Sequence, residues 1–370
     1  MVSYLSNAEH TPTALAFQHA RLLVSLGFEV QVFSSQELRL PHMPHYLGNK
    51  GDLLTPAPNV AVLQKIIPEG VTVTFSDERF SLLYRTREII EKIAEFDPDL
   101  VFFIGLNSVL MTTLYQSRPV LGLCVHAVAP MAPVDVWLAA TPSLAKQRSQ
   151  AWGAVIPAAL ASYHPYRISL KPVHTVLARE DLNVTADQVL LVSVGSRLGT
   201  EISGEWAARM AGLVQQHPAA VWVLMGGLGV LPPALAQLPA EKIRLLPHHA
   251  DVRSVYRCCD VYVNPPRLGG GFSVAEAMAE SLPVVAFADS DGGNKLDGYA
   301  VETMAGYLDL LGALLDSAAL RQQNGALMRA LFSATLDLER SASSLLAACY
   351  AALACYHQRV GVGVGGDDSD

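Results

Sequence analysis

Short apolar runs of strand length alternate with helical patterns along almost the whole chain. In the first half, three such runs predict strands and two amphipathic patterns predict helices. The predicted strands are Glu29–Phe33, Leu100–Gly105 and Arg118–His126, and the predicted helices are Thr13–Leu26 and Phe80–Phe96. A strand that is buried on both faces reads as a continuous apolar run. The alternation is therefore typical of α/β layers around parallel sheets.

The same alternation restarts in the second half, after a proline-rich and polar stretch from Tyr163 to Pro172. Its predicted strands are Val189–Val194, Ala220–Met225, Ile243–Leu246, Val261–Val263 and Val284–Phe287, with a helix at Ser203–Gln216. A chain of 370 residues is also too long for one ordinary core. We therefore predict two Rossmann-like, doubly wound domains facing a central cleft, at residues 1–165 and 166–335. A C-terminal helix at 336–360 is expected to pack back towards the first domain, and residues 361–370 to form a disordered tail.

Composition limits the partners of such a chain. Half of the residues (51%) are hydrophobic and only 16% are charged, so large cores can form. The formal charge of −8 argues against a nucleic-acid-binding surface. No cluster of Lys and Arg stands out, which argues against a strong electrostatic membrane anchor but leaves peripheral membrane contact open. The longest apolar run, from Val120 to Ala140, is broken by His126, Asp135 and prolines, so no transmembrane helix is expected.

The cysteines and the N-terminal residues predict a cytoplasmic protein. The five cysteines form no CxxC pair and show no zinc-site spacing, and most lie in apolar runs. This pattern fits reduced, buried thiols. The first residues lead at once into Asn7, Glu9 and His10, which is not the pattern of a signal peptide.

The most informative segment runs from Asp260 to Met278. A predicted strand leads into three glycines, Gly269–Gly271, and then into a helix whose N-cap is expected at Ser273. Glycines let a ligand approach the backbone amides closely, and a helix N-terminus adds partial positive charge, so the segment suits a diphosphate. Glu276 is expected in the first helical turn, where its carboxylate could accept hydrogen bonds from two ribose hydroxyls. The structural alternative is an ordinary glycine-rich turn between a strand and a helix.

The run from Phe272 to Val285, which includes Glu276-Ala277-Met278 and Pro283-Val284-Val285, resembles the donor-site phrase of the "group 1" retaining glycosyltransferases. The resemblance covers mainly Val189 to Val301. It implies a GT-B fold and a metal-independent hexosyltransferase in which the second domain holds most of a nucleotide-sugar donor. No cofactor is then expected, because the nucleotide sugar is a substrate. The residues expected to bind the donor are Gly269, Gly270, Gly271, Phe272, Ser273, Glu276 and His249.

The chain departs from the family pattern in two places. The family usually has a glutamate eight positions before Glu276, where this chain has Leu268. The family also has an Arg followed by a Lys on the loop after the first strand of the second domain. This chain supplies Arg197 without a nearby lysine, and Glu201 stands close by with no family role. Arg197 is therefore the expected phosphate-neutralising residue, with a solvated surface cation as its structural alternative.

Four further residues are candidates by context. His126 matches a family histidine near the donor sugar, although a single histidine at a strand end is often structural. His248 and His249 follow a strand near the expected base site, and at most one of them can face a ligand. Lys295 could approach the diphosphate or the acceptor. Asp289 and Asp291 invite a DxD metal interpretation, but no metal site is expected, because GT-B enzymes normally act without one.

Two other functions stay open. A nucleotide-sugar 2-epimerase would need clustered carboxylates and histidines, and no such set is clear in the sequence. A non-catalytic GT-B subunit would explain the missing glutamate and lysine, but not the retained Gly269–Gly271, Glu276 and Arg197. The nucleotide base, the sugar, the linkage and the oligomeric state are not encoded in any motif. The acceptor could be a glycan, a lipid-linked glycan or a small molecule.

Overall fold

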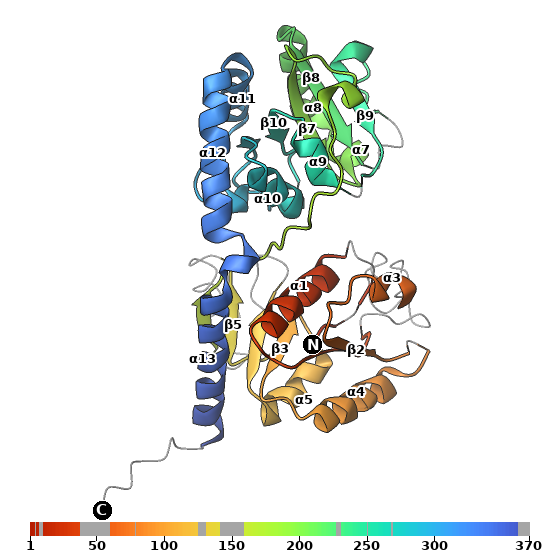
Figure 1. Ribbon diagram of the computed structural model, residues 1–370, viewed down its shortest axis with the longest axis vertical. Coiled ribbons are helices and arrows are strands. Elements are labelled where there is room, and N and C mark those ends of the chain that lie inside the picture. Colours follow the sequence, from red (N-terminus) through yellow and green to blue (C-terminus); the bar gives the residue numbers. More distant parts are fainter. Residues whose placement is uncertain are drawn as a thin grey trace, which may run out of the picture. The chain divides into compact units, whose positions relative to one another are not determined.

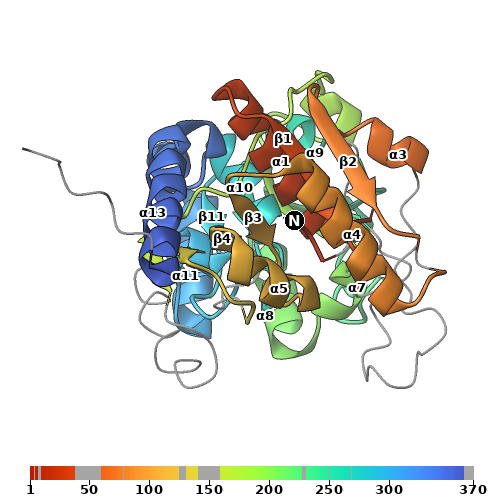
Figure 2. The same ribbon diagram turned by 90° about the horizontal axis from the view of Figure 1, so that it is seen from below.

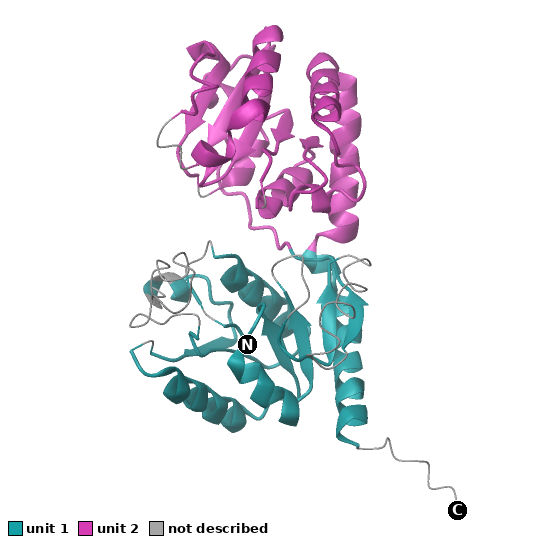
Figure 3. Cartoon of the chain, turned by 180° about the vertical axis from the view of Figure 1, so that it is seen from behind, with its two compact units in different colours: residues 1–167, 338–370 teal, residues 168–337 magenta. Residues whose placement is uncertain are grey.

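The computed structural model describes residues 1–3, 5–6, 10–37, 60–77, 79–124, 131–140, 159–226, 231–249, 251–267 and 269–361. Its contacts divide the chain into two compact units (Figure 3). Unit 1 comprises Met1–Arg167 together with Leu338–Asp370, and unit 2 comprises Ile168–Asp337. The chain therefore leaves unit 1 once and returns to it at the C-terminal end.

Unit 1 contains parallel strands in two groups. β1 (Val30–Ser34) pairs with β2 (Val71–Phe75), and a separate sheet has the order β3 (Val101–Ile104), β4 (Val120–Leu123), β5 (Val136–Ala139) and β6 (Leu160–Tyr163). Residues 1–3 link the two groups, since Val2 forms a parallel bridge with Ile104 and donates its amide to the Phe33 carbonyl at 3.0 Å. The helices of the unit are α1 (Thr11–Ser25), α3 (Val60–Gln64), α4 (Leu82–Phe96), α5 (Val109–Ser117) and α13 (Ala342–Val360). Helices α4 and α5 pack side by side (Figure 2).

Helix α13 belongs to unit 1 because it packs along β4 and β5 (Figure 1). Arg359, in the last turn of the helix, places its Nε 2.9 Å from Oδ1 of Asp135, whose side chain is only 2% exposed. The same guanidinium lies 3.7 Å from the ring centroid of Tyr115. A buried carboxylate and an aromatic face thus hold the end of the chain on the sheet of unit 1.

Unit 2 is built on one parallel sheet of strand order β11-β10-β7-β8-β9. These strands are β7 (Val189–Val194), β8 (Ala220–Met225), β9 (Ile243–Leu246), β10 (Val261–Val263) and β11 (Val284–Val285). The helices are α7 (Leu198–Glu201), α8 (Gly204–Gln216), α9 (Val252–Tyr256), α10 (Gly271–Ala279), α11 (Met304–Asp316) and α12 (Ala318–Thr335). Because β7 is first in the chain and lies in the middle of the sheet, the order of the strands reverses between β7 and β10. This is the Rossmann arrangement, with its topological switch point between those two strands.

Both faces of this sheet are buried, as the apolar runs predict. Alternate residues of β7 point to opposite sides, so that Leu190 joins one core and Leu191 the other. Helices α10 and α12 cover the first face, while α8 and α11 cover the second. The predicted bounds of β7, β8, β9 and β10 agree with the structure. The predicted strand at Val284–Phe287 is shorter, because β11 ends at Val285 and Phe287 makes only an isolated bridge with Val301.

The sequence analysis missed β2, β5 and β6, and it also made strands of unit 1 too long. The strand predicted at Leu100–Gly105 extends one residue beyond β3 at each end. The strand predicted at Arg118–His126 begins at Val120 and ends at Leu123, and residues 125–130 lie outside the described part. All five cysteines are free, and Cys355 alone among them is partly exposed. No helix in the described ranges combines the length and the apolarity needed to cross a membrane. The predicted tail at 361–370 is described only at Gly361.

Candidate functional site

The candidate site lies in unit 2, at the carboxyl ends of β7 and β10 (Figure 1). These neighbouring strands are tied together where they end, since the buried Ser193 hydroxyl donates to the Val263 carbonyl at 2.6 Å. The loop after β7 carries Arg197, and the loop after β10 carries Gly269–Gly271. Open parallel sheets bind ligands at this switch point, because the two loops diverge there and leave room between them. The fold therefore brings together two elements that are about 70 residues apart in the chain.

Helix α10 begins earlier than predicted. Its N-cap is Gly270, with φ of +90°, and its first residue is Gly271. Only glycine adopts this left-handed conformation without strain, so the turn into the helix is completed before Ser273. The prediction of Ser273 as the N-cap is thus wrong, and Ser273 is the third helical residue. Glu276 is the sixth, so it lies in the second turn rather than the first.

Arg267 is a residue of the site that the sequence analysis did not single out. Its side chain is only 4% exposed, and its Nη1 lies 2.9 Å from Oε2 of Glu201. The guanidinium also donates to the Asn264 side chain at 2.9 Å, the Val194 carbonyl at 3.0 Å and the Tyr262 hydroxyl at 3.1 Å. It therefore links the loops after β7 and β10 through four acceptors.

The glycines around Arg267 are needed for space. A Cβ atom at Gly195 would lie 2.5 Å from Arg267 Nη1, and one at Gly270 would lie 2.5 Å from its Cζ. Both distances are shorter than any ordinary contact. The glycine loop thus folds directly against a buried guanidinium, which fixes the path of the chain into α10.

Glu201 forms ion pairs with both Arg267, which is buried, and Arg197, which the sequence analysis predicted as a site residue. Its side chain is 12% exposed, and its other oxygen, Oε1, accepts from Arg197 Nε at 3.1 Å. The Arg197 side chain is 69% exposed, and its Nη2 lies 3.1 Å from the position that a Cβ on Gly269 would take. The structure therefore places the exposed cation Arg197 beside the glycine loop, held from behind by Glu201.

Backbone amides of the glycine loop, beside Arg197, are further hydrogen-bond donors of the site. In the described ranges, the amides of Gly269, Gly270 and Phe272 make no hydrogen bond. The Gly271 amide differs, because it donates to Oδ2 of Asp291 at 3.0 Å. Lys295 Nζ lies 3.5 Å from Oδ1 of the same carboxylate. Asp291 thus contacts both the N-terminus of α10 and Lys295. This carboxylate occupies the position at the helix N-terminus where an anionic ligand was expected.

Glu276 lies on α10 in a strongly desolvated place. Burial raises the pKa of its carboxyl to about 7, although Lys171 and Arg253 act in the opposite direction. Glu276 forms neither a hydrogen bond nor an ion pair with any residue that the structure describes. Its carboxyl group is therefore held in place by the helix and remains available to a ligand.

The contacts of the other predicted site residues say less about ligand binding. Phe272 is partly buried against the core on the α10 side of the sheet. His249 Nδ1 is 2.9 Å from the Asp251 carbonyl, and Asp251 accepts from the amides of His174 and Thr175 at 2.9 Å each. His126 lies outside the described residues. In the described ranges, no group of three or more His, Cys, Asp or Glu side chains could hold a metal ion.

Part of unit 2 matches a known protein family. The model of the family described as "Glycosyl transferases group 1" matches residues 189–316, about a third of the chain, and this match includes Arg197, Arg267, Glu276 and Lys295. No curated protein sequence matches.

Several solved structures share the fold at low sequence identity. Anabaena Alr3699/HepE in complex with UDP and glucose is 13% identical, with a TM-score of 0.61 over 94% of this chain and 97% of that one. The glycosyltransferase SnogD from Streptomyces nogalater is 16% identical, with a TM-score of 0.52 over 94% and 97%. A putative UDP-N-acetylglucosamine 2-epimerase from Listeria monocytogenes is 17% identical, with a TM-score of 0.54 over 94% of each chain. The shared fold is the GT-B arrangement of two Rossmann-like units, and the match to the group 1 glycosyltransferase family lies within unit 2, at residues 189–316.

Proposed function

We propose that the chain transfers a sugar, with retention of its anomeric configuration, from a nucleotide-sugar donor to an acceptor. One observation carries the proposal: Arg197, the N-terminus of α10 and the glycine-loop amides, which no described residue accepts from at Gly269 and Gly270, meet at the switch point of unit 2. A guanidinium and helix N-terminal amides are the groups that proteins use to hold diphosphates. The donor diphosphate then lies against Gly269 and Gly270, with Arg197 beside it.

Glu276 takes the ribose in this proposal. Its carboxylate has no partner among the residues that the structure describes, and it lies on the helix whose N-terminus faces the diphosphate. Two ribose hydroxyls can donate to its two oxygens, and each such charge-assisted hydrogen bond contributes roughly 1.5–3 kcal/mol. Since the pKa of Glu276 is about 7, the carboxyl group must lose its proton before it can accept both hydrogen bonds.

Catalysis then rests on charge stabilisation rather than on a protein nucleophile. As the bond from the anomeric carbon to the phosphate oxygen breaks, negative charge develops on the departing diphosphate. Arg197 and the loop amides are fixed before the reaction, so they stabilise that charge without reorganisation. Lys295, which Asp291 holds at the N-terminus of α10, supplies a second cation. The proposal therefore needs neither a metal ion nor a cofactor.

A second candidate function is a non-catalytic GT-B subunit. The substitution of the family's first glutamate by Leu268 and the lack of a lysine close behind Arg197 favour it. The fold does not separate an epimerase from a transferase either, since the Listeria epimerase is as similar as SnogD. Unit 2 nevertheless keeps Arg197, the glycine loop and Glu276 in a geometry that fits donor binding, which favours the transferase.

The test is a panel of nucleotide sugars, beginning with UDP-glucose because the Anabaena structure contains UDP and glucose. The proposal predicts that one donor releases its nucleoside diphosphate, faster with an acceptor, and that the anomeric configuration of the product equals that of the donor. A product of the opposite anomeric configuration would contradict the retaining mechanism. Interconversion of two nucleotide sugars would instead identify an epimerase. The free cysteines fit the cytoplasm, where we place the reaction.

A further inference from the structure

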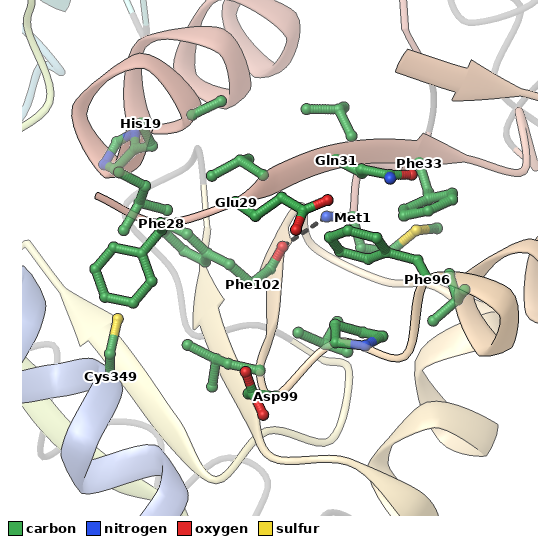
Figure 4. Close-up of a pocket in the computed structure, with 18 of the residues that line it drawn as sticks. Met1, His19, Phe28, Glu29, Gln31, Phe33, Phe96, Asp99, Phe102 and Cys349 are labelled. Carbon is green, nitrogen blue, oxygen red and sulfur yellow. Dashed lines mark hydrogen bonds between the residues drawn. The ribbon is translucent and has the colours of Figure 1, made fainter. Parts of the chain in front are cut away.

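Unit 1 contains a cavity of about 300 Å³ directly ahead of Met1. Its walls come from β1, the start of β3, α1, α4 and α13, and they carry mostly apolar side chains (Figure 4). A single water needs only about 10–15 Å³ of such space, so the cavity is far larger than an ordinary packing defect. Unfilled apolar space of this size reduces stability, because the lining side chains lose their contacts.

Backbone geometry shows that the cavity separates two strands with open edges. On β1, Ser34 accepts from Ser76 on the β2 side, whereas Phe33 accepts from Val2 on the other side. On β3, Val101 donates towards β4, whereas Phe102 accepts from the Met1 amine at 2.6 Å. Since successive residues of a strand point their backbone groups to opposite sides, Gln31 and Leu100 also face the cavity. Both strands therefore present to the same space ladder positions that no described residue pairs with.

Residues 1–3 fill only the carboxyl end of this gap. Ile104 donates to the Met1 carbonyl at 2.9 Å, and Val2 bridges Ile104 in parallel, so the segment already has the geometry of a strand. The Met1 amine continues that ladder and is buried, and this burial lowers its pKa to about 5. A charged amine is poorly placed there, whereas a peptide N–H would satisfy the same hydrogen bond to Phe102.

We propose that this cavity is the seat of an extended apolar segment, joined to the Met1 nitrogen, that completes one parallel sheet from β2 to β6. The occupant is the stretch that would precede Met1 in a longer form of the chain. A separate peptide would bring its own terminal carboxylate next to the buried amine, and two terminal groups would then need space and pairing. A covalent extension replaces the amine by a peptide group and continues the ladder without a break.

The register sets the length of the segment. Val2 pairs with Ile104, and Val101 lies three residues before Ile104, so Val101 faces the position two residues ahead of Met1. One more residue reaches the level of Leu100, and about three residues therefore fill the gap. Their side chains would cover Val30 and Phe102, which remain half-buried although Val32 and Phe103 next to them are buried.

The test compares three forms of the whole chain: unextended, extended before Met1 by Val-Ile-Val, and extended there by Gly-Ser-Gly as the matched control. The apolar extension is expected to raise Tm by at least about 3 °C over the control. It should also slow hydrogen exchange at the Phe33 and Phe102 amides by tenfold or more, because both amides then join a ladder. Equal Tm values and equal exchange in the two extended forms would overturn the proposal.

A binding measurement excludes another occupant. The unextended chain is expected to bind the dye anilinonaphthalene sulfonate, whose aromatic rings enter apolar space. The Val-Ile-Val extension should abolish that binding because both occupy one space. Dye binding in this cavity that persists undiminished in the apolar-extended form would contradict the proposal and indicate a small-molecule site instead.

Discussion

The Asp291 carboxylate accepts a hydrogen bond from the Gly271 amide at 3.0 Å, at the first residue of α10. A Cβ on Gly271 would lie 2.7 Å from Asp291 Cγ, so the two residues are in direct contact. An acidic residue stabilises a helix N-terminus because it neutralises the partial positive charge there. In a diphosphate site, however, the same carboxylate competes with the ligand for that charge.

Asp291→Asn is expected to tighten binding of a nucleoside diphosphate by about 3- to 10-fold. The amide oxygen can still accept from Gly271, while the repulsion between carboxylate and phosphate is removed. Titration calorimetry at low and high salt measures the effect, which should shrink as salt screens the charge. Ser290→Ala is the control at the neighbouring position. Weaker or unchanged binding in the Asp291 variant would show that the diphosphate lies elsewhere.

The second prediction concerns the pH dependence of Glu276. Burial raises its pKa from 4.5 to about 7, so the folded state binds the proton more tightly than the unfolded state does. The ionised carboxyl group therefore costs stability, and that cost develops as the pH rises from about 4.5 through 7. Glu276→Gln should be more stable than the wild type by about 1–3 kcal/mol at pH 8 and little changed at pH 4.5. Thermal unfolding across this range measures the difference, and a gain that is equal at both pH values would contradict the burial of the charge.

The same carboxyl group should make donor binding depend on pH. Only the ionised form accepts two hydrogen bonds from the ribose, so nucleotide affinity is expected to rise as the pH increases through about 7. In Glu276→Gln the affinity should be lower and its rise across this range lost. Isothermal titration of UDP and of other nucleoside diphosphates provides the measurement. A wild-type nucleotide affinity that does not change between pH 6 and pH 8 would contradict the proposed contact between Glu276 and the ribose.

Arg267 and Arg197 both pair with Glu201, but substitution of each is expected to cost a different amount of unfolding free energy. Arg267→Met removes a buried cation with four acceptors and should cost about 2–4 kcal/mol of unfolding free energy. Arg197→Ala removes a mostly exposed partner of Glu201 and should cost less than about 1 kcal/mol. Denaturant unfolding of both variants checks this order. Equal losses of stability would contradict the structural role given to Arg267.

Turnover is expected to continue without a divalent metal. Arg197, Lys295 and the loop amides already face the expected position of the diphosphate, and Asp291 is engaged by Gly271 and Lys295. Rates measured with and without EDTA should agree within experimental error. Loss of activity in EDTA that magnesium or manganese restores would favour Asp289 and Asp291 as metal ligands.

The sheet of unit 2 was predictable because its strands are buried on both faces. Val189–Val194 and Ala220–Met225 are uninterrupted apolar runs, so their bounds follow directly from the sequence. Strand β5, Val136–Ala139, lies within the long apolar run that begins near Val120, and it has only four residues, so it did not stand out as a separate strand behind the one predicted at Arg118–His126.

The site was less predictable, because its contacts join loops that are distant in the chain. Nothing next to Arg267 in the sequence indicates that its guanidinium contacts Glu201, since that contact exists only because β7 and β10 are neighbours. The start of α10 was misplaced because Ser273 is the better N-cap by residue type, whereas the N-cap is Gly270, three residues earlier. The left-handed conformation of Gly270 and the Asp291 carboxylate, which accepts from the Gly271 amide, begin the helix there. Asp291 resembled half of a metal motif in the sequence, and in the fold it caps a helix.

The most direct test of the proposed function is the turnover of Arg197→Ala with the best donor of the panel. Arg197 is the exposed cation beside the glycine loop, so its loss should reduce kcat by about 100- to 1,000-fold while the Kd for the nucleotide rises much less. Lys295→Ala should share part of the loss in kcat. Arg209→Ala, whose guanidinium pairs with Glu205 on the surface of α8, is the control that should keep the wild-type rate. A wild-type rate in Arg197→Ala, or a wild-type protein that binds nucleotide sugars and never turns one over with any acceptor, would contradict the proposal.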